Sequence, residues 1–306
     1  MANQQINRCV WIVDTIRRYG RITRNELAEL WLRSPINDSH RPLTRRTFYN
    51  YRDAVEELFN LRIECDPVTY EYYIDEDSFG SKGMTEWLLN SFSLHETLSG
   101  AHDVAERIVL EDVPSAREHL GTVIDAIKRN QMIRFNYHAY TRSTPTTGVV
   151  LCPYFLKLFK QRWYVVGLHT AQNRIKTYAL DRMRATVALS DTFTPDPTID
   201  PEHYFEYSYG IVVEEKNPPR KVVLKVEPRQ AKYFAALPLH HSQTQTVADG
   251  YSLFTYQLRI TTDFVEELLS HANAIEVLEP KELRATIRTK LADTLALYNS
   301  QESAHP

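Results

Sequence analysis

The spacing of apolar residues changes along the chain, and this change constrains the fold more than any other feature. Between residues 6 and 58 apolar side chains recur every three or four positions, which is typical of amphipathic helices. From residue 123 to residue 180 they alternate in short strands, and from residue 221 onward strands alternate with helices. We therefore expect an α+β protein of several domains, for which 306 residues are enough.

Residues 1–78 predict a winged helix-turn-helix domain. A first helical stripe stops at Gly20, and Thr23 with Glu26 forms a capping box that begins a second helix. Thr44 caps a third helix, and strands at 61–65 and 70–74 form a hairpin, the wing. The buried stripe expected on the third helix is Phe48, Tyr51, Val55 and Leu58.

The strongly basic residues of this domain are all arginines, which favours binding to nucleic acid. The first 75 residues contain eleven Arg and no Lys against eleven acidic residues, and the guanidinium fork matches phosphate and guanine. A small helical domain with a solvated arginine face is the alternative. The positions of the third helix that we expect to contact double-stranded operator DNA are Arg45, Arg46, Thr47, Tyr49, Asn50 and Arg52.

The rest of the chain is expected to hold a helical connector over residues 79–122, a small barrel over 123–200 and an α+β domain over 201–306. Five short strands favour the barrel. They are expected at 132–138, 149–154, 156–159, 162–168 and 174–180. The last helix begins at Pro280, with an expected apolar stripe at Leu283, Ile287, Leu291, Leu295 and Tyr298.

Two of these strands suggest a site. The strand 162–168 is apolar on both faces, so it should be covered on both sides. Arg174, Lys176, Tyr178 and Arg182 share one parity, so a strand reaching residue 182 would carry three cations and a phenol on one face. That face is either solvated or an anion-binding site, with Arg162 and His169 near it in the chain.

These strands resemble the signature of the WYL-domain transcriptional regulators. The matching segments are Phe135-Asn-Tyr137, Pro153, Arg162-Trp163-Tyr164-Val165-Val166-Gly167 and Tyr178-Ala-Leu180-Asp181-Arg182, with Val165 in place of leucine. The resemblance implies a homodimeric DNA-binding regulator with an Sm-like barrel that senses a nucleotide or single-stranded nucleic acid. Several relatives control DNA-damage or phage-defence genes. By position, the ligand-binding candidates are Tyr137, Trp163, Tyr164, His169, Arg174 and Arg182.

Other classes of protein fit the sequence less well. No run of about 18 apolar residues could span a membrane and no signal segment is seen, so we expect a cytoplasmic protein. Cys9, Cys65 and Cys152 suit reduced thiols better than disulfides or zinc. No catalytic or phosphate-loop motif occurs and the chain has nine Gly, so we expect neither an enzyme nor a cofactor. His240 and His241 are expected in a loop, without a metal.

We therefore expect a ligand-responsive transcriptional regulator, a repressor in the simplest form, that binds operator DNA as a homodimer. The alternative is an RNA- or single-stranded-nucleic-acid-binding module that acts through the barrel without an operator. An RNA-binding module of that kind would not require the arginine-rich winged helix.

Overall fold

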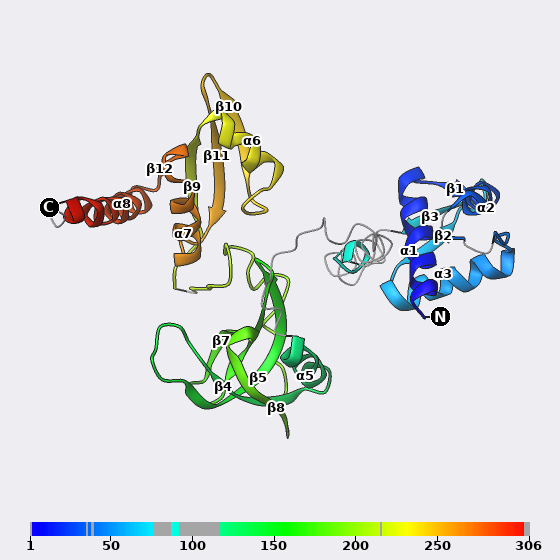
Figure 1. The fold of residues 1–306 in the computed structure, drawn as a ribbon, viewed down its shortest axis with the longest axis horizontal. Helices are drawn as coiled ribbons and strands as arrows, with labels where there is room; N and C mark the ends of the chain where they lie inside the picture. Colours follow the sequence, from blue (N-terminus) through cyan, green and yellow to red (C-terminus); the bar gives the residue numbers. More distant parts are fainter. Residues whose placement is uncertain are drawn as a thin grey trace. The chain divides into compact units, whose positions relative to one another are not determined.

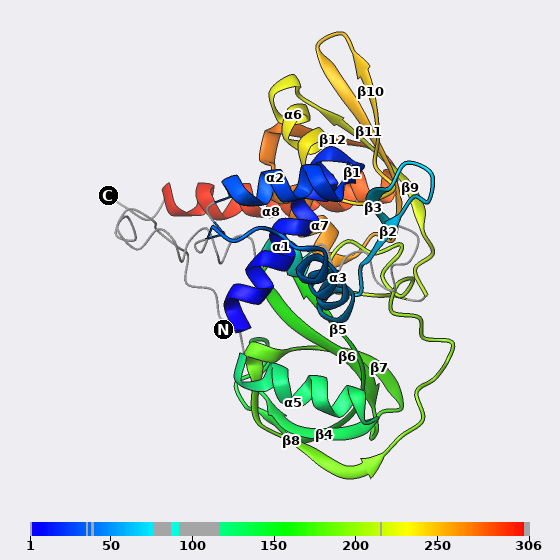
Figure 2. The ribbon, with the colours of Figure 1, turned by 90° about the vertical axis from the view of Figure 1, so that its right-hand side faces the viewer.

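The structure is a computed structural model that describes residues 2–34, 36–37, 40–75, 87–91, 117–214 and 216–302. It divides into two compact units, residues 1–111 and residues 112–306, shown in Figures 1 and 2. Most of the connector predicted for residues 79–122 lies outside the described residues. None of the helices in the described ranges is long and apolar enough to cross a membrane.

The first unit contains the predicted helices and hairpin. Its elements in chain order are α1 (Ala2–Tyr19), β1 (Ile22–Thr23), α2 (Arg24–Arg33), α3 (Arg45–Phe59), β2 (Arg62–Cys65) and β3 (Glu71–Asp75). The strands form an antiparallel sheet in the order β1-β3-β2. The two-residue strand β1 was not predicted, because it is too short to show alternation.

Local capping fixes where these helices begin and end. Thr23 and Glu26 form the predicted capping box, and the Thr44 side chain accepts a hydrogen bond from the Thr47 amide. Asn60 ends α3 in the left-handed conformation, with φ of 52°. The prediction of a buried Leu58 was wrong. Leu58 is 43% exposed and Phe59 packs into the core instead, because it lies one turn after Val55 on the buried side.

The second unit begins with a helix and a five-stranded sheet. Its elements are α5 (Arg117–Lys128), β4 (Gln131–Tyr137), β5 (Thr146–Phe159), β6 (Arg162–His169), β7 (Arg174–Ala179), the 3₁₀ turn η3 (Leu180–Arg182) and β8 (Met183–Thr192). The strand order is β7-β6-β5-β4-β8, and all neighbours are antiparallel. A closed barrel remains a prediction.

Three strand predictions need correction. The segments 149–154 and 156–159 belong to one strand, β5, which continues through a register shift between Pro153 and Phe155. A bulge is where an interior strand can accommodate the missing amide hydrogen of proline. The strand β7 ends at Ala179, so Arg182 lies in η3 and not on the face that carries Tyr178. The strand β8 was not predicted.

One face of this sheet packs against α5. Val165 lies opposite Tyr178, and Ile133 lies opposite Leu151, so these four side chains share a face. They form a buried cluster with Val123 and other residues of α5. β6 is thus an interior strand, and its residues from Tyr164 to Gly167 are all buried, as the two apolar faces predicted.

The C-terminal elements of this unit have the order β-α-β-β-α-β followed by a helix. They are β9 (Arg220–Val226), α6 (Pro228–Ala236), β10 (Thr244–Ala248), β11 (Tyr251–Leu258), α7 (Thr262–Ser270), η4 (Ala272–Ala274), β12 (Ile275–Glu279) and α8 (Lys281–Glu302). The sheet order is β10-β11-β9-β12, and its core contains residues of α6 and α7. The largely exposed strand β10 was not predicted.

The stripe predicted on α8 is buried only at its beginning. Leu283 is buried and Ile287 packs against the core, whereas Leu291, Leu295 and Tyr298 are exposed. The reason is visible in Figure 1, where the second half of α8 extends beyond β12 and α7.

Candidate nucleic-acid interface and ligand site

The first turns of α3 present a polar surface. Arg45, Arg46 and Asn50 are exposed, whereas Thr47, Tyr49 and Arg52 are half-buried. The first turn of α3 carries no acidic residue, so no carboxylate there offsets the partial positive charge at the N-terminus of the helix. This surface can therefore accept phosphate or base edges.

The loop between α2 and α3 is held by Asn37, which is buried. Its side-chain nitrogen donates to the Arg41 carbonyl at 3.0 Å, and its side-chain oxygen accepts from the Arg41 amide at 3.1 Å. The indole nitrogen of Trp31 donates to the same carbonyl at 3.0 Å. These bonds satisfy the backbone amide and carbonyl of Arg41 and fix the loop that leads into α3.

Tyr49 and Arg52 also have partners inside the domain. The Tyr49 hydroxyl lies 3.3 Å from the hydroxyl of Tyr72 on β3, and the guanidinium of Arg52 lies 4.7 Å from the centre of the Tyr49 ring. The hydrogen bond to Tyr72, with the positive charge of Arg45, lowers the pKa of Tyr49. Tyr49 thus joins α3 to the wing, while Arg45, Arg46 and Asn50 remain directed outward.

Arg21 lies just before β1 and was not among the residues that we expected to contact DNA. Its guanidinium donates to Asp66 at 2.9 Å and lies 4.7 Å from the centre of the Tyr73 ring. Its side chain is about half exposed, and its charge is paired with Asp66 in the turn of the hairpin. The contact joins residues that are 45 positions apart, so it depends on folding.

In the sheet of the second unit, Tyr137 and Tyr178 belong to the core. Their rings lie 4.8 Å apart, and the Tyr137 hydroxyl accepts a hydrogen bond from the Ala179 amide at 3.3 Å. Burial raises the pKa of Tyr178 to about 12. Tyr164 is buried as well, and burial raises its pKa. Trp163 packs against the same core from a half-buried position.

The cations predicted to bind the ligand lie in two separate places. His169 is paired with Arg174 in the register, at the turn between β6 and β7. Arg182 lies beyond the other end of β7, with its guanidinium 4.1 Å from the centre of the Tyr140 ring. Residues 174 and 179 are five positions apart in a strand, or about 17 Å. Arg174 and Arg182 therefore lie near opposite ends of β7, and Arg182 is not among the residues that line the hollow around Arg174.

Arg174 lines a hollow of about 890 Å³ beside β5, β6 and β7. The opposite wall comes from residues 196–217, which follow β8. The lining combines aromatic, cationic, acidic and apolar side chains, among them Tyr154, Tyr204, Lys216, Asp196, Glu214 and Leu168. The volume lies within the range of small-ligand sites, and most of the lining residues carry polar or charged groups.

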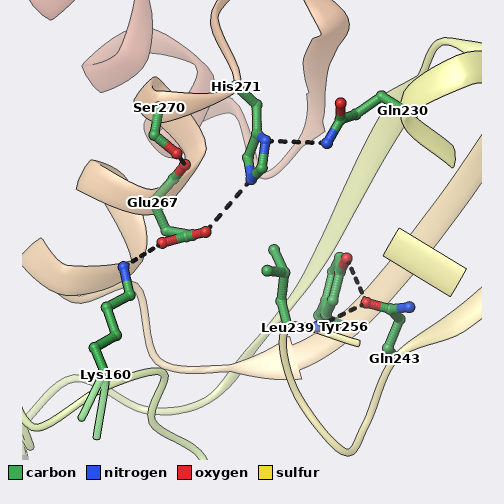
Figure 3. Close-up of polar contacts among 8 residues, drawn as sticks. All are labelled: Lys160, Gln230, Leu239, Gln243, Tyr256, Glu267, Ser270 and His271. Carbon is green, nitrogen blue, oxygen red and sulfur yellow. Dashed lines mark hydrogen bonds and ion pairs between the residues drawn. The ribbon is translucent and has the colours of Figure 1, made fainter. Parts of the chain in front are cut away.

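The hairpin of β5 and β6 is bonded to the C-terminal elements, as Figure 3 shows. Lys160 in the turn donates to Glu267 of α7 at 2.7 Å. Glu267 lies 3.4 Å from Nε2 of His271, whose Nδ1 accepts from Gln230 of α6 at 3.2 Å. Burial opposes the charge on Glu267, but hydrogen bonds from Lys160 and Tyr209 lower its pKa. The turn is thus tied to both α6 and α7.

Lys157 makes a second connection from β5. Its ammonium donates to the Gly210 carbonyl at 2.6 Å and lies 3.5 Å from the centre of the Phe205 ring. Burial lowers the pKa of Lys157 to about 8, and the charge of Asp263 partly opposes this. Asp263 accepts hydrogen bonds from the amides of Ile211 and Val212 at 2.8 and 3.1 Å. The segment around residue 210 is thereby fixed between β5 and α7.

The remaining candidates do not form a metal site. In the described part of the chain, no three His, Cys, Asp or Glu side chains converge in a way that could hold a metal ion. His240 and His241 lie in a loop, as expected, with hydrogen bonds to Ser242 and to the Glu206 carbonyl. All three cysteines are free, and burial raises the pKa of Cys9 to about 11 and also raises that of Cys152.

The two modules of the second unit match known protein families. The first module is the five-stranded sheet with α5, and the second is the β-α-β-β-α-β module. Residues 118–187 are a WYL domain and residues 218–295 are a WCX domain. The predicted WYL resemblance and its C-terminal extension domain are therefore confirmed.

Two solved structures have some similarity to this chain. Proteasome accessory factor B/C (PafBC) of Arthrobacter aurescens is 20% identical, with a TM-score of 0.37 over 94% of this chain and 46% of that chain. A CRISPR Cas-related protein is 11% identical, with a TM-score of 0.38 over 61% of this chain and 53% of that chain. This chain thus spans about half the length of the structures that it matches. No curated protein matched the sequence.

Proposed function

We propose that this protein is a ligand-responsive transcriptional regulator, in which α2 and α3 form the helix-turn-helix, β2 and β3 form the wing, and the WYL domain receives the signal. One observation carries the proposal: Arg45, Arg46 and Asn50 are exposed on the first turns of α3, in a chain that also has a WYL domain. The N-terminal residues of a recognition helix are those nearest to the bases in the major groove.

In this function α3 reads operator DNA. Arg45 and Arg46 supply forks for guanine or phosphate, and Asn50 supplies an amide for adenine. Thr47, Tyr49 and Arg52 support the helix and contact the sugar-phosphate backbone at its edge. The protein acts as a homodimer with one helix per half-site, and as a repressor that a nucleotide or single-stranded nucleic-acid signal releases.

The alternative function, nucleic-acid binding through the WYL sheet alone, has less support. The sheet face with Val165 and Tyr178 is packed against α5, so it offers no row of exposed aromatic rings for stacked bases. The exposed cations of α3 would also have no role in such a module.

Selection of double-stranded fragments from a random pool, followed by sequencing, tests the proposal. Wild-type protein should enrich a pseudo-palindrome, because a two-fold dimer places two recognition helices about 34 Å apart or a multiple of it. Arg45→Ala with Arg46→Ala should lose the enrichment, since each base-reading arginine contributes about 1–3 kcal/mol. Arg229→Ala, an exposed arginine on α6, is the matched control and should enrich the wild-type sequence. Equal enrichment by the double variant would reject α3 as the recognition helix.

A further inference from the structure

The hollow beside β5, β6 and β7 has walls that neither family match covers completely. Arg174, Tyr154 and Leu168 belong to the WYL domain, whereas Asp196, Glu214 and Lys216 lie between residue 187, where the WYL match ends, and residue 218, where the WCX match begins. The site therefore combines a strand wall with a linker wall. Its chemistry cannot be read from either domain alone.

The linker wall is a fixed structure. The side chain of Asn217 donates to the Ile260 carbonyl at 2.9 Å, and its backbone carbonyl accepts from Arg259 at 3.1 Å. Asp196 accepts from the amide and hydroxyl of Thr198 at 2.9 and 2.7 Å, which lowers its pKa and keeps it ionised. Tyr154 stacks on Phe193, with ring centres 5.7 Å apart. The two bonds of Asn217 hold the turn that carries Glu214 and Lys216 against the C-terminal module.

The lining carries two cations, Arg174 and Lys216, and two carboxylates, Asp196 and Glu214, so a ligand must offer partners to both kinds of group. Arg174 and Lys216 carry two positive charges, which match the charge of about −1.5 to −2 on one phosphate monoester. Asp196 and Glu214 lie in the same lining, so a triphosphate would bring further negative charge toward two carboxylates. The same carboxylates can accept hydrogen bonds from sugar hydroxyls and from base N–H groups, and the Tyr154 and Tyr204 rings supply aromatic contact.

We infer that this hollow binds a nucleoside monophosphate, with the phosphate between Arg174 and Lys216 and the sugar or base directed at Asp196 and Glu214. This inference deepens the proposed function, because it names the signal site and the signal class. Ligand binding here would join the WYL strands to the turn fixed on the C-terminal module. The bound state would thus differ from the free state by contacts across the two modules, which is the requirement for a ligand to shift an equilibrium.

Calorimetric titration of the full chain tests the inference without operator DNA. The probes are ribonucleoside 5′-monophosphates, the matching nucleosides and inorganic phosphate. The wild type should bind a monophosphate more tightly than either of its two parts. Lys216→Ala should weaken monophosphate binding about tenfold or more, the size expected for one charge-assisted hydrogen bond, and should leave nucleoside binding unchanged. Glu214→Gln should weaken the nucleoside and the monophosphate alike.

Lys221→Ala removes an exposed lysine of β9 that pairs with Glu279, and it is the matched control. Monophosphate binding that is equal in the Lys216 and Lys221 variants would overturn the inference, as would a wild type that binds no monophosphate. A short single-stranded oligonucleotide that binds the wild type and Lys216→Ala equally would place the signal elsewhere. Each of these results leaves operator selection by α3 untouched, so the failure of this inference is distinct from failure of the proposed function.

Discussion

Gly167, in the strand that carries the WYL signature, is the residue whose replacement should damage the second unit most sharply. It lies opposite Pro153, next to the bulge of β5. A Cβ atom built on Gly167 would lie 2.2 Å from the backbone oxygen of Cys152 and 3.0 Å from a side-chain carbon of Leu151. The obstructing atom is backbone, so it cannot rotate away. The absence of a side chain at residue 167 is what lets β5 and β6 approach there.

The cost of Gly167→Ala can be worked out from this contact. Moving the Cβ atom to even 3.0 Å requires a shift of about 0.8 Å, which stretches a hydrogen bond of about 2.9 Å beyond the normal range. Two weakened ladder bonds cost about 1 kcal/mol each, and forcing an extra carbon into a packed site costs about 1–3 kcal/mol. The sum is about 3–5 kcal/mol. For a unit of this size, it lowers the unfolding midpoint by about 6–20 °C.

Thermal unfolding of the full chain, followed by far-ultraviolet circular dichroism, measures this effect. The control is the same substitution at Gly121 in α5, where nothing lies within 4 Å of the added Cβ atom. Because alanine is favoured over glycine in a helix by about 1 kcal/mol, Gly121→Ala should raise the midpoint slightly. Opposite signs are therefore expected for the two variants. An unchanged midpoint for Gly167→Ala would refute the reasoning from close strand approach.

Two further predictions concern the bonds that join the β5–β6 hairpin to the C-terminal module. The pKa of Lys157 falls from 10.5 in the unfolded chain to about 8 in the folded one, so the unfolded chain binds more protons above pH 8 and stability should rise with pH. Between pH 7 and 9 the gain is about 1 kcal/mol after allowance for partial exposure, and Lys157→Met should abolish it in urea unfolding. Glu267→Gln should destabilise the second unit by about 1–2 kcal/mol, because Lys160 and Tyr209 lose a charged acceptor. Lys160→Ala should cost less, since its side chain is 62% exposed, and the reverse order in thermal unfolding would contradict this account.

Features set by neighbours in sequence were predictable, and features set by distant contacts were not. The capping box at Thr23 and the cap at Thr44 involve residues three positions apart, so the sequence contains the whole interaction. The strand β10 is largely exposed, and no alternation of apolar residues marks it. In β8, Met183, Ala185, Val187 and Leu189 do alternate with other residues, so this strand had a signal in the sequence that the prediction did not use. The sequence predicts two strands, 149–154 and 156–159, but the bulge between Pro153 and Phe155 lets β5 continue as one strand.

Residues that act through tertiary contacts left no pattern to find. Asn37 holds the loop before α3 from a segment rich in polar residues, where its burial has no local signal. Lys157 lies on a strand, but its burial depends on Phe205 and Gly210, about fifty positions later in the chain. Lys216 and Glu214 come from an irregular turn. A sequence pattern can indicate the chemistry of such residues but not which surface they share.

The separation of Arg174 from Arg182 shows the limit of arguing from strand parity. Parity assigns a side chain to a face, and it says nothing about distance along the strand, which grows by about 3.3 Å per residue. Arg174 and Arg182 were grouped because their numbers are both even, yet the chain leaves β7 at Ala179 and turns through η3 before Arg182. Arg174 instead shares the lining of the hollow with Lys216, which lies on another segment. In the proposed site the second cation comes from another segment, the linker after β8, which strand parity could not indicate.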